Sequence, residues 1–216
     1  MNEADWVERI AAELKGQQWL EQDGLALRTG LKIAYGCEIR SYGPQPETQI
    51  ISFETDLAII ETAEGGRWKP RVVVEAKLGS VTTHDAITYS QKAVSHRAVH
   101  PYLRYGIMLG NRKHYPLPGR LYRHGAHFDF MISFRGVESV EFETAMFVEL
   151  LKGEVAASRT LEKVLYESRR KGRAHYILLH RQLQVKCAQP AMDGPGGAAS
   201  CDPPSAFPCS SSPSPE

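Results

Sequence analysis

The sequence contains little cysteine and no long apolar segment. Its four cysteines are Cys37, Cys187, Cys201 and Cys209, and none of them forms a C-x-x-C pair. This spacing excludes both a disulfide framework and a zinc ribbon. No apolar run approaches the length of about 18 residues that a membrane helix needs, and no charged-then-apolar leader opens the chain. We therefore expect a cytoplasmic protein with no membrane partner.

The sequence also lacks an excess of charge of either sign, because its formal net charge is +1. The total therefore indicates no partner, although the distribution is uneven. Residues 91–135 contain one acid, Asp129, and eight basic residues: Lys92, Arg97, Arg104, Arg112, Lys113, Arg120, Arg123 and Arg135. Such an asymmetry is typical of a surface that binds a polyanion. The alternative is that the charges of both signs interleave in space.

Apolar periodicity and turn residues predict an alternation of helices and strands. The predicted elements are a helix over 5–15, strands over 25–41, 51–61, 71–79, 102–110 and 128–134, a helix over 84–100 and helices from 140 to about 184. A helix between two strands in the middle of the chain favours a mixed α/β fold, in which helices flank a mixed β-sheet.

Composition divides the chain into three parts. We expect an α/β core over 1–136, a C-terminal helical extension of the same domain over 137–186, and a disordered tail over 187–216. The tail is assigned because proline, glycine, serine and alanine dominate it, and large apolar residues are rare there.

Two neighbouring strands carry an acid–acid–lysine set. Asp56 lies on the predicted strand 51–61, and Glu75 and Lys77 lie near the end of strand 71–79. Alternation places Glu75 and Lys77 on one face of the strand, with the small residue Ala76 opposite. Two carboxylates and an approachable carbonyl are the oxygen ligands that Mg²⁺ prefers, and an ammonium can orient water or phosphate. The alternative is a simple ion pair at the end of a strand.

The helix over 84–100 is predicted to turn Ile87, Gln91, Val94 and Ala98 toward the core. Its opposite face would present Tyr89, Lys92, His96 and Arg97, and the loop after strand 102–110 would add Arg112 and Lys113. These side chains suit contacts with the phosphates of a nucleic acid, and the alternative is a solvated polar face. The spacing of His96 and His100 is compatible with zinc, but no third ligand is visible, which favours solvated or phosphate-facing histidines.

From about Trp6 to Phe134 the chain resembles the PD-(D/E)xK nuclease superfamily, whose restriction-endonuclease-like core is helix, three strands, helix, strand. The segment Val-Val-Val-Glu75-Ala76-Lys77 matches its acid-x-Lys strand, and Asp56 matches its preceding acid. The resemblance implies that Asp56, Glu75 and the Ala76 carbonyl bind Mg²⁺ or Mn²⁺, and that Lys77 positions or activates water. It also implies supporting roles for Glu13 and for Gln91.

Two positions depart from the superfamily pattern. Thr55 stands where the family has proline, and Ser95 stands where a tyrosine follows the glutamine. The resemblance implies a metal-dependent DNA endonuclease, acting alone, as a homodimer or in a larger nuclease complex. The alternative is a catalytically inactive module on the same fold that binds nucleic acid or serves in assembly.

Overall fold

The computed structural model describes residues 1–112, 117–138, 140–167, 171, 177–180 and 183–186. The chain divides into two units, Met1–Ile177 and Leu178–Glu216. Residues 178–180 and 183–186 of the second unit form no helix or strand. Within the described ranges, no helix combines the length and apolar composition that crossing a membrane requires.

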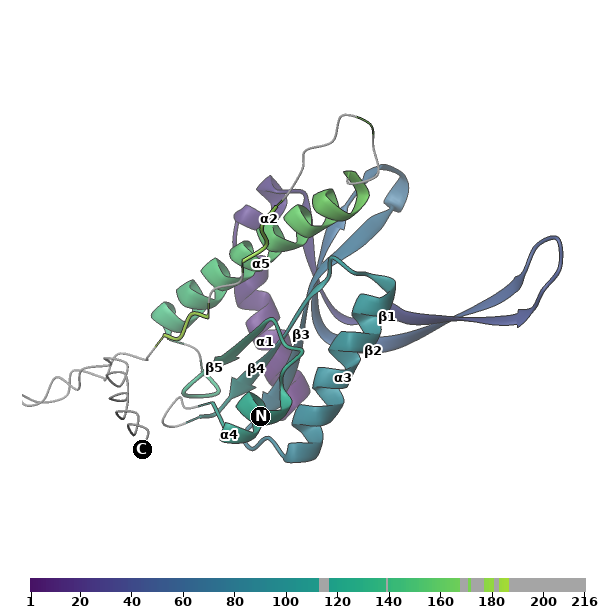
Figure 1. The fold of residues 1–216 in the computed structure, drawn as a ribbon. Coiled ribbons are helices and arrows are strands. Elements are labelled where there is room, and N and C mark those ends of the chain that lie inside the picture. Colours follow the sequence, from purple (N-terminus) through teal and green to yellow (C-terminus); the bar gives the residue numbers. More distant parts are fainter. Residues whose placement is uncertain (113–116, 139, 168–170, 172–176, 181–182, 187–216) are drawn as a thin grey trace, which may run out of the picture. The chain divides into compact units, whose positions relative to one another are not determined.

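The first unit contains a five-stranded mixed sheet with helices on both faces, as the sequence predicts (Figure 1). The strands lie in the order β1-β2-β3-β4-β5, antiparallel from β1 to β3 and parallel from β3 to β5. The elements are α1 (Glu3–Lys15), α2 (Trp19–Gln22), β1 (Leu25–Ser41), β2 (Glu47–Thr62), η1 (Glu64–Gly66), β3 (Trp68–Leu78), α3 (Thr83–Val99), β4 (Arg104–Gly110), α4 (Gly119–His124), β5 (Phe130–Ser133) and α5 (Glu141–Glu167).

Capping boxes define where the two helices beside the candidate residues begin. At α1, Asn2 and Asp5 exchange side-chain and backbone hydrogen bonds, and at α3 Thr82 and Asp85 do the same. Each box satisfies two backbone N–H groups that the first helical turn leaves without partners. The start of α3 is thereby placed directly after the end of β3.

Strand alternation divides the core into two layers. Val72, Val74 and Ala76 of β3 pack in the cluster that contains the buried residues of α1 and α5. Val73 packs in the opposite cluster, with Ala86 and Ala93 of α3. By alternation, the odd-numbered residues that follow Val73 on β3 also face α3.

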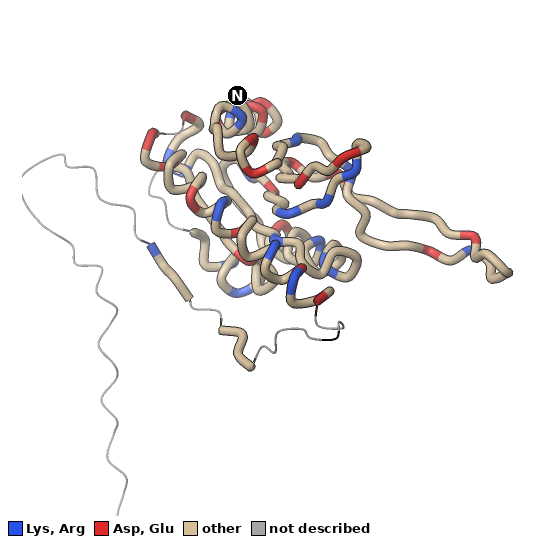
Figure 2. The backbone as a smooth tube through the Cα atoms, turned by 90° about the horizontal axis from the view of Figure 1, so that it is seen from above, with Lys and Arg blue, Asp and Glu red and all other residues tan. Residues whose placement is uncertain are grey.

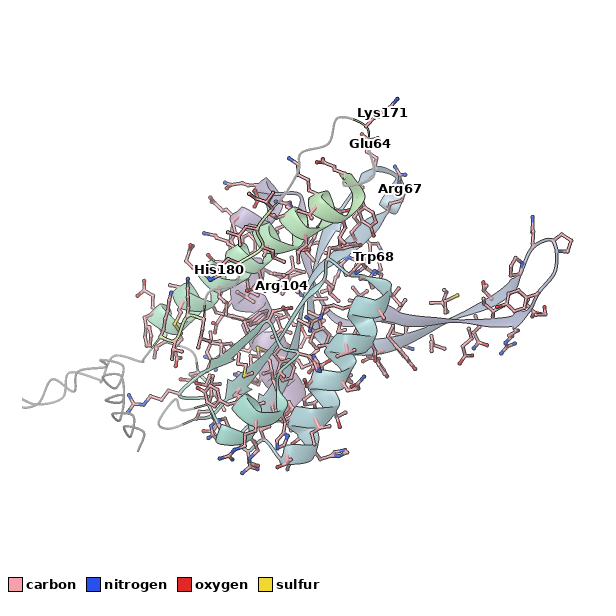
Figure 3. All side chains as sticks on the ribbon, in the orientation of Figure 1. Glu64, Arg67, Trp68, Arg104, Lys171 and His180 are labelled. Atoms are coloured by element: carbon pink, nitrogen blue, oxygen red, sulfur yellow. The ribbon has the colours of Figure 1, made fainter. Side chains whose placement is uncertain are left out.

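The hairpin of β1 and β2 extends beyond the part of β2 that pairs with β3. The β1–β2 ladder extends to the pair Ser41↔Glu47, whereas the β2–β3 ladder ends at Leu57↔Val74. Residues 37–50, here called the arm, are all exposed. Figures 1 and 3 show the arm and its side chains standing clear of the helices. The strand β2 therefore leaves β3 immediately before Leu57.

The prediction of which face of α3 points into the core is wrong. Ile87 is 51% exposed and Gln91 is exposed, while Ala86, Ser90, Ala93 and His96 are buried. The buried face consists of small and polar residues, and Ala86 and Ala93 pack in one cluster with the large side chains Tyr105, Ile107 and Leu109 of β4. Apolar side chains lie on several sides of this helix, so that their spacing does not identify the buried face.

The predicted C-terminal helices are shorter than expected. The helix α5 ends at Glu167, and residues 177–180 and 183–186 are not helical. Leu178, Leu179 and Leu183 are each more than 70% exposed, and a short helix without packing is marginal in water. The predicted tail over 187–216 lies outside the described residues.

We expect that Gly106→Ala destabilises the protein, because the added Cβ would lie 2.3 Å from the Phe130 ring on the neighbouring strand. Overpacking of this kind costs about 1–3 kcal/mol of unfolding free energy. The matched control is Gly153→Ala in α5, where nothing lies within 4 Å of the added methyl group. That change should stabilise the helix by roughly 0.5–1 kcal/mol. Urea denaturation measures both, and equal effects would contradict the packing described for β4 and β5.

Candidate acidic site

Where β2 stops pairing with β3, a side chain takes the place of the next backbone hydrogen bond of the ladder. Asp56 Oδ2 accepts a hydrogen bond of 2.7 Å from the backbone N–H of Ala76. The neighbouring residue Thr55 is buried and donates its hydroxyl to the Leu31 carbonyl at 2.9 Å. Asp56 thus points toward β3 while Thr55 holds β2 against β1. The Asp56 carboxylate is thereby placed beside Glu75, the residue that precedes Ala76 on β3.

Glu75 is a buried carboxylate on the α3-facing side of β3, with 2% of its surface exposed. Its Oε1 accepts a hydrogen bond from the Tyr105 hydroxyl of β4. Lys92 Nζ of α3 lies 3.4 Å from Oε1 and 3.5 Å from Oε2. A buried charge is costly unless it is paired and hydrogen-bonded, and both partners supply that compensation.

Burial raises the pKa of Glu75 from its ordinary value of 4.5 to about 7. The positive charge of Lys92 and the hydrogen bond from Tyr105 oppose this rise, whereas the negative charge of Asp56 adds to it. The contribution of Asp56 places the two acids close enough to interact. Glu75 therefore changes its protonation near neutral pH, as a carboxyl group in a functional site often does.

Lys77 lies between two acids that come from the ends of two helices. Its Nζ is 3.9 Å from Glu3 Oε2 of α1 and 4.0 Å from Asp85 Oδ1 of α3. Glu3 is held in place because its Oε2 also accepts a hydrogen bond of 2.9 Å from the backbone N–H of Leu78. The end of β3 therefore brings a second pair of carboxylates near the first.

Tyr89 of α3 lies close enough to all four acids for their charges to act on its hydroxyl group. Its pKa is raised to about 12, first by burial and then by the negative charges of Glu75, Asp56, Glu3 and Asp85. We define the acidic site as these four carboxylates together with Lys77, Lys92, Tyr89 and Tyr105. It combines β2, β3, β4 and the starts of α1 and α3 in one electrostatic environment.

The donor set fits a hard divalent cation. Among the described residues, no three of His, Cys, Asp and Glu are grouped closely enough to hold an ion by themselves. Mg²⁺ is usually bound by only one or two carboxylates, with waters and substrate phosphate completing its shell. Asp56 and Glu75 meet that requirement. The N–H of the buried residue Ala76 orients Asp56 at the same point.

The structure does not bring Glu13 to the acidic site. Glu13 accepts a hydrogen bond from Thr144 of α5 at 3.1 Å and lies 3.6 Å from Arg9. It is ten residues from Glu3, or roughly 15 Å along the helix axis. Glu3 is the acid of α1 that lies at the end of β3. The sequence signal for Glu3 is its position in the first turn of α1, which the prediction did not use.

Gln91 of α3 is the other residue with an expected supporting role. It is exposed, and its backbone carbonyl accepts a hydrogen bond from Ser95. It lies on the surface of α3, whereas the next residue, Lys92, turns into the acidic site. Asp85 and Tyr105 are further members that sequence reasoning did not assign. Asp85 had a signal, since it is the acid of the Thr82 capping box, while Tyr105 reaches Glu75 only through sheet pairing.

His96 does not face phosphate, because it is fully buried between α3 and β1. Its Nδ1 donates a hydrogen bond of 3.1 Å to the Ala34 carbonyl, and its ring stacks on Tyr105 at 5.5 Å. Burial lowers the pKa of His96 to about 4, so the ring is neutral at pH 7. A neutral buried imidazole cannot supply the cationic contact that the sequence predicted.

Both of the expected phosphate-binding arginines have structural partners. Arg97 lies 3.4 Å from Asp129 and donates to the His127 carbonyl, and Arg112 donates to the Gly79 carbonyl at 3.2 Å. Lys113 lies outside the described residues. Figure 2 shows basic and acidic positions interleaved over the first unit, as in the alternative reading of the charge pattern.

The residues at the opposite end of β3 lie far from the acidic site. Figure 3 labels Glu64, Arg67 and Trp68 at the turn between β2 and β3. Trp68 is roughly 30 Å along the strand from Lys77. The exposed indole of Trp68 is therefore not part of the acidic site.

We expect Glu75→Gln to change how stability depends on pH. Folding raises the pKa of Glu75 from 4.5 to about 7. Between these values the folded protein retains a proton that the unfolded chain has lost, so Glu75 lowers stability as pH rises through this window. The window corresponds to roughly 3 kcal/mol. The free energy of unfolding of Glu75→Gln relative to wild type should therefore increase from pH 4.5 to 7 and then level off. Parallel pH profiles in urea denaturation would contradict this assignment.

No family model matches the chain, and no curated protein matches it.

Proposed function

We propose that this protein is a metal-dependent nuclease of the PD-(D/E)xK superfamily that hydrolyses phosphodiester bonds in DNA. The observation that carries the proposal is the convergence of Asp56 and Glu75 at the point where β2 leaves β3. The ladder ends at Leu57↔Val74, and the Asp56 carboxylate takes up the Ala76 N–H just beyond that pair. The mixed five-stranded sheet with α3 between β3 and β4 is compatible with this family.

In this proposal Asp56, Glu75 and the Ala76 carbonyl hold Mg²⁺ or Mn²⁺. When bound, such a cation neutralises charge on the phosphate and lowers the pKa of an attacking water. The protein contributes orientation, because Asp56 is held by a backbone N–H and Glu75 by Tyr105 and Lys92. A lysine of the site supplies positive charge for phosphate oxygens.

A polyanionic substrate agrees with the cations around the start of α3. Arg120 of α4 donates to the Val81 carbonyl at 2.7 Å, just before α3 begins, and Arg123 of α4 is exposed. Cations at such a position attract phosphates without reading bases. The preference for DNA over RNA rests on the resemblance to the nuclease family.

A second candidate function is a catalytically inactive module that binds nucleic acid or serves in assembly. One observation favours it: Lys92 already neutralises Glu75, as a purely structural ion pair would do. This function would require no metal, and its DNA binding would weaken with salt.

We expect the wild-type protein to cleave plasmid DNA in the presence of Mg²⁺ or Mn²⁺, and Asp56→Asn to reduce the rate by about 100-fold or more. Asparagine can still accept the Ala76 N–H but cannot bring a negative charge, so the fold should be retained. Calorimetry should show a divalent-cation site in wild type that is lost in Asp56→Asn.

The matched control for this variant is Glu54→Gln, an exposed acid two residues earlier on the same face of β2. It should cleave DNA and bind Mg²⁺ at nearly the wild-type level. Inert wild-type protein across metals and DNA forms, or Asp56→Asn protein that cuts as well as Glu54→Gln, would refute the nuclease proposal. Salt-dependent DNA binding by protein that binds no divalent cation would support the inactive module.

A further inference from the structure

Two lysines reach the acidic site from different elements, and they have different partners. Lys92 Nζ of α3 lies 3.4 Å and 3.5 Å from the two oxygens of Glu75. Lys77 Nζ of β3 lies 3.9 Å from Glu3 and 4.0 Å from Asp85. The strand lysine, which the sequence pattern singles out, is thus paired with the acids of the two helix ends. The helix lysine faces the buried acid of the strand.

Aromatic rings hold the Lys92 ammonium in this position. It lies 5.6 Å from the centroid of the Phe53 ring and 5.1 Å from that of the Tyr89 ring. Phe53 is itself fixed by stacking on Tyr35 at 3.7 Å. Cation–π contacts stabilise an ammonium at such a place without neutralising it. The Lys92 side chain keeps 22% exposure, so that it is not sealed inside the core.

The position of Lys92 makes it a competitor of any cation that binds Glu75. Glu75 needs a positive neighbour because it is almost fully buried, and Lys92 supplies that charge. A divalent cation on the same carboxylate would be repelled by the ammonium at close range. The ammonium would then be released from Glu75 but kept nearby by the rings of Phe53 and Tyr89, where a substrate phosphate can pair with it.

We propose that Lys92, and not Lys77, is the ammonium that serves the Asp56–Glu75 pair: it balances Glu75 at rest and contacts the substrate phosphate during cleavage. Lys77 instead holds Glu3 and Asp85 together at the end of β3. This inference rests on the proposed nuclease function for its second half, while its first half concerns the protein without substrate.

The experiment compares Lys92→Met with Lys77→Met and uses Lys92→Arg as the variant that keeps the charge. Calorimetry measures Mg²⁺ binding without DNA, and single-turnover cleavage of plasmid DNA measures the reaction. We expect Lys92→Met to bind Mg²⁺ about tenfold more tightly, because a competing positive charge is removed. The same variant should cleave about 100-fold more slowly. Lys92→Arg should bind Mg²⁺ nearly as wild type does, and Lys77→Met, which removes an ammonium paired with Glu3 and Asp85, should bind Mg²⁺ within about threefold of wild type.

The opposite signs of the two effects separate this role from structural damage, which would weaken Mg²⁺ binding and cleavage together. Loss of both in Lys92→Met, or tighter Mg²⁺ binding with slow cleavage in Lys77→Met, would overturn the inference. If the wild type binds Mg²⁺ but cleaves nothing, the nuclease proposal fails, and the Mg²⁺ affinities alone decide whether Lys92 balances Glu75. If the wild type binds no divalent cation, both proposals are refuted.

Discussion

The hydrogen bond from the Ala76 N–H to the Asp56 carboxylate is the contact on which the acidic site depends. It lies where β2 stops pairing with β3, and it gives the backbone N–H of Ala76 a partner beyond the end of the ladder. A backbone partner at the same place would have kept the ladder continuous. Because a side chain takes that role, β2 can turn outward with β1 into the arm, and a carboxylate stays at the point of separation.

The burial of Glu75 imposes the second constraint. A carboxylate with 2% exposure needs compensating groups, and they come from elements on two sides, Tyr105 of β4 and Lys92 of α3. The small residues on the inner face of α3 allow the helix to approach the strands closely enough for Lys92 to reach. The packing of α3 on the sheet therefore also decides whether Lys92 can compensate the charge of Glu75.

Residue patterns predicted the order of the main elements and the mixed sheet, because local periodicity and turns decide these features. They failed for α3, where the buried face carries Ser90 and His96 instead of Ile87. They also assigned Glu13 as the acid of α1, although Glu3 lies at the end of β3. A helical pattern does not reveal which turn of the helix lies beside a given strand.

The sequence by itself determined the α/β class, the strand alternation that aligns Glu75 with Lys77, and the caps that begin α1 and α3. Each of these depends on residues only a few positions apart, where backbone geometry and hydrogen-bonding capacity are decisive. Tertiary structure alone decided which acids and lysines meet. Tyr105, Lys92 and Glu3 reach the end of β3 from distant positions in the chain, and only the packing of helices on the sheet sets the distances between them.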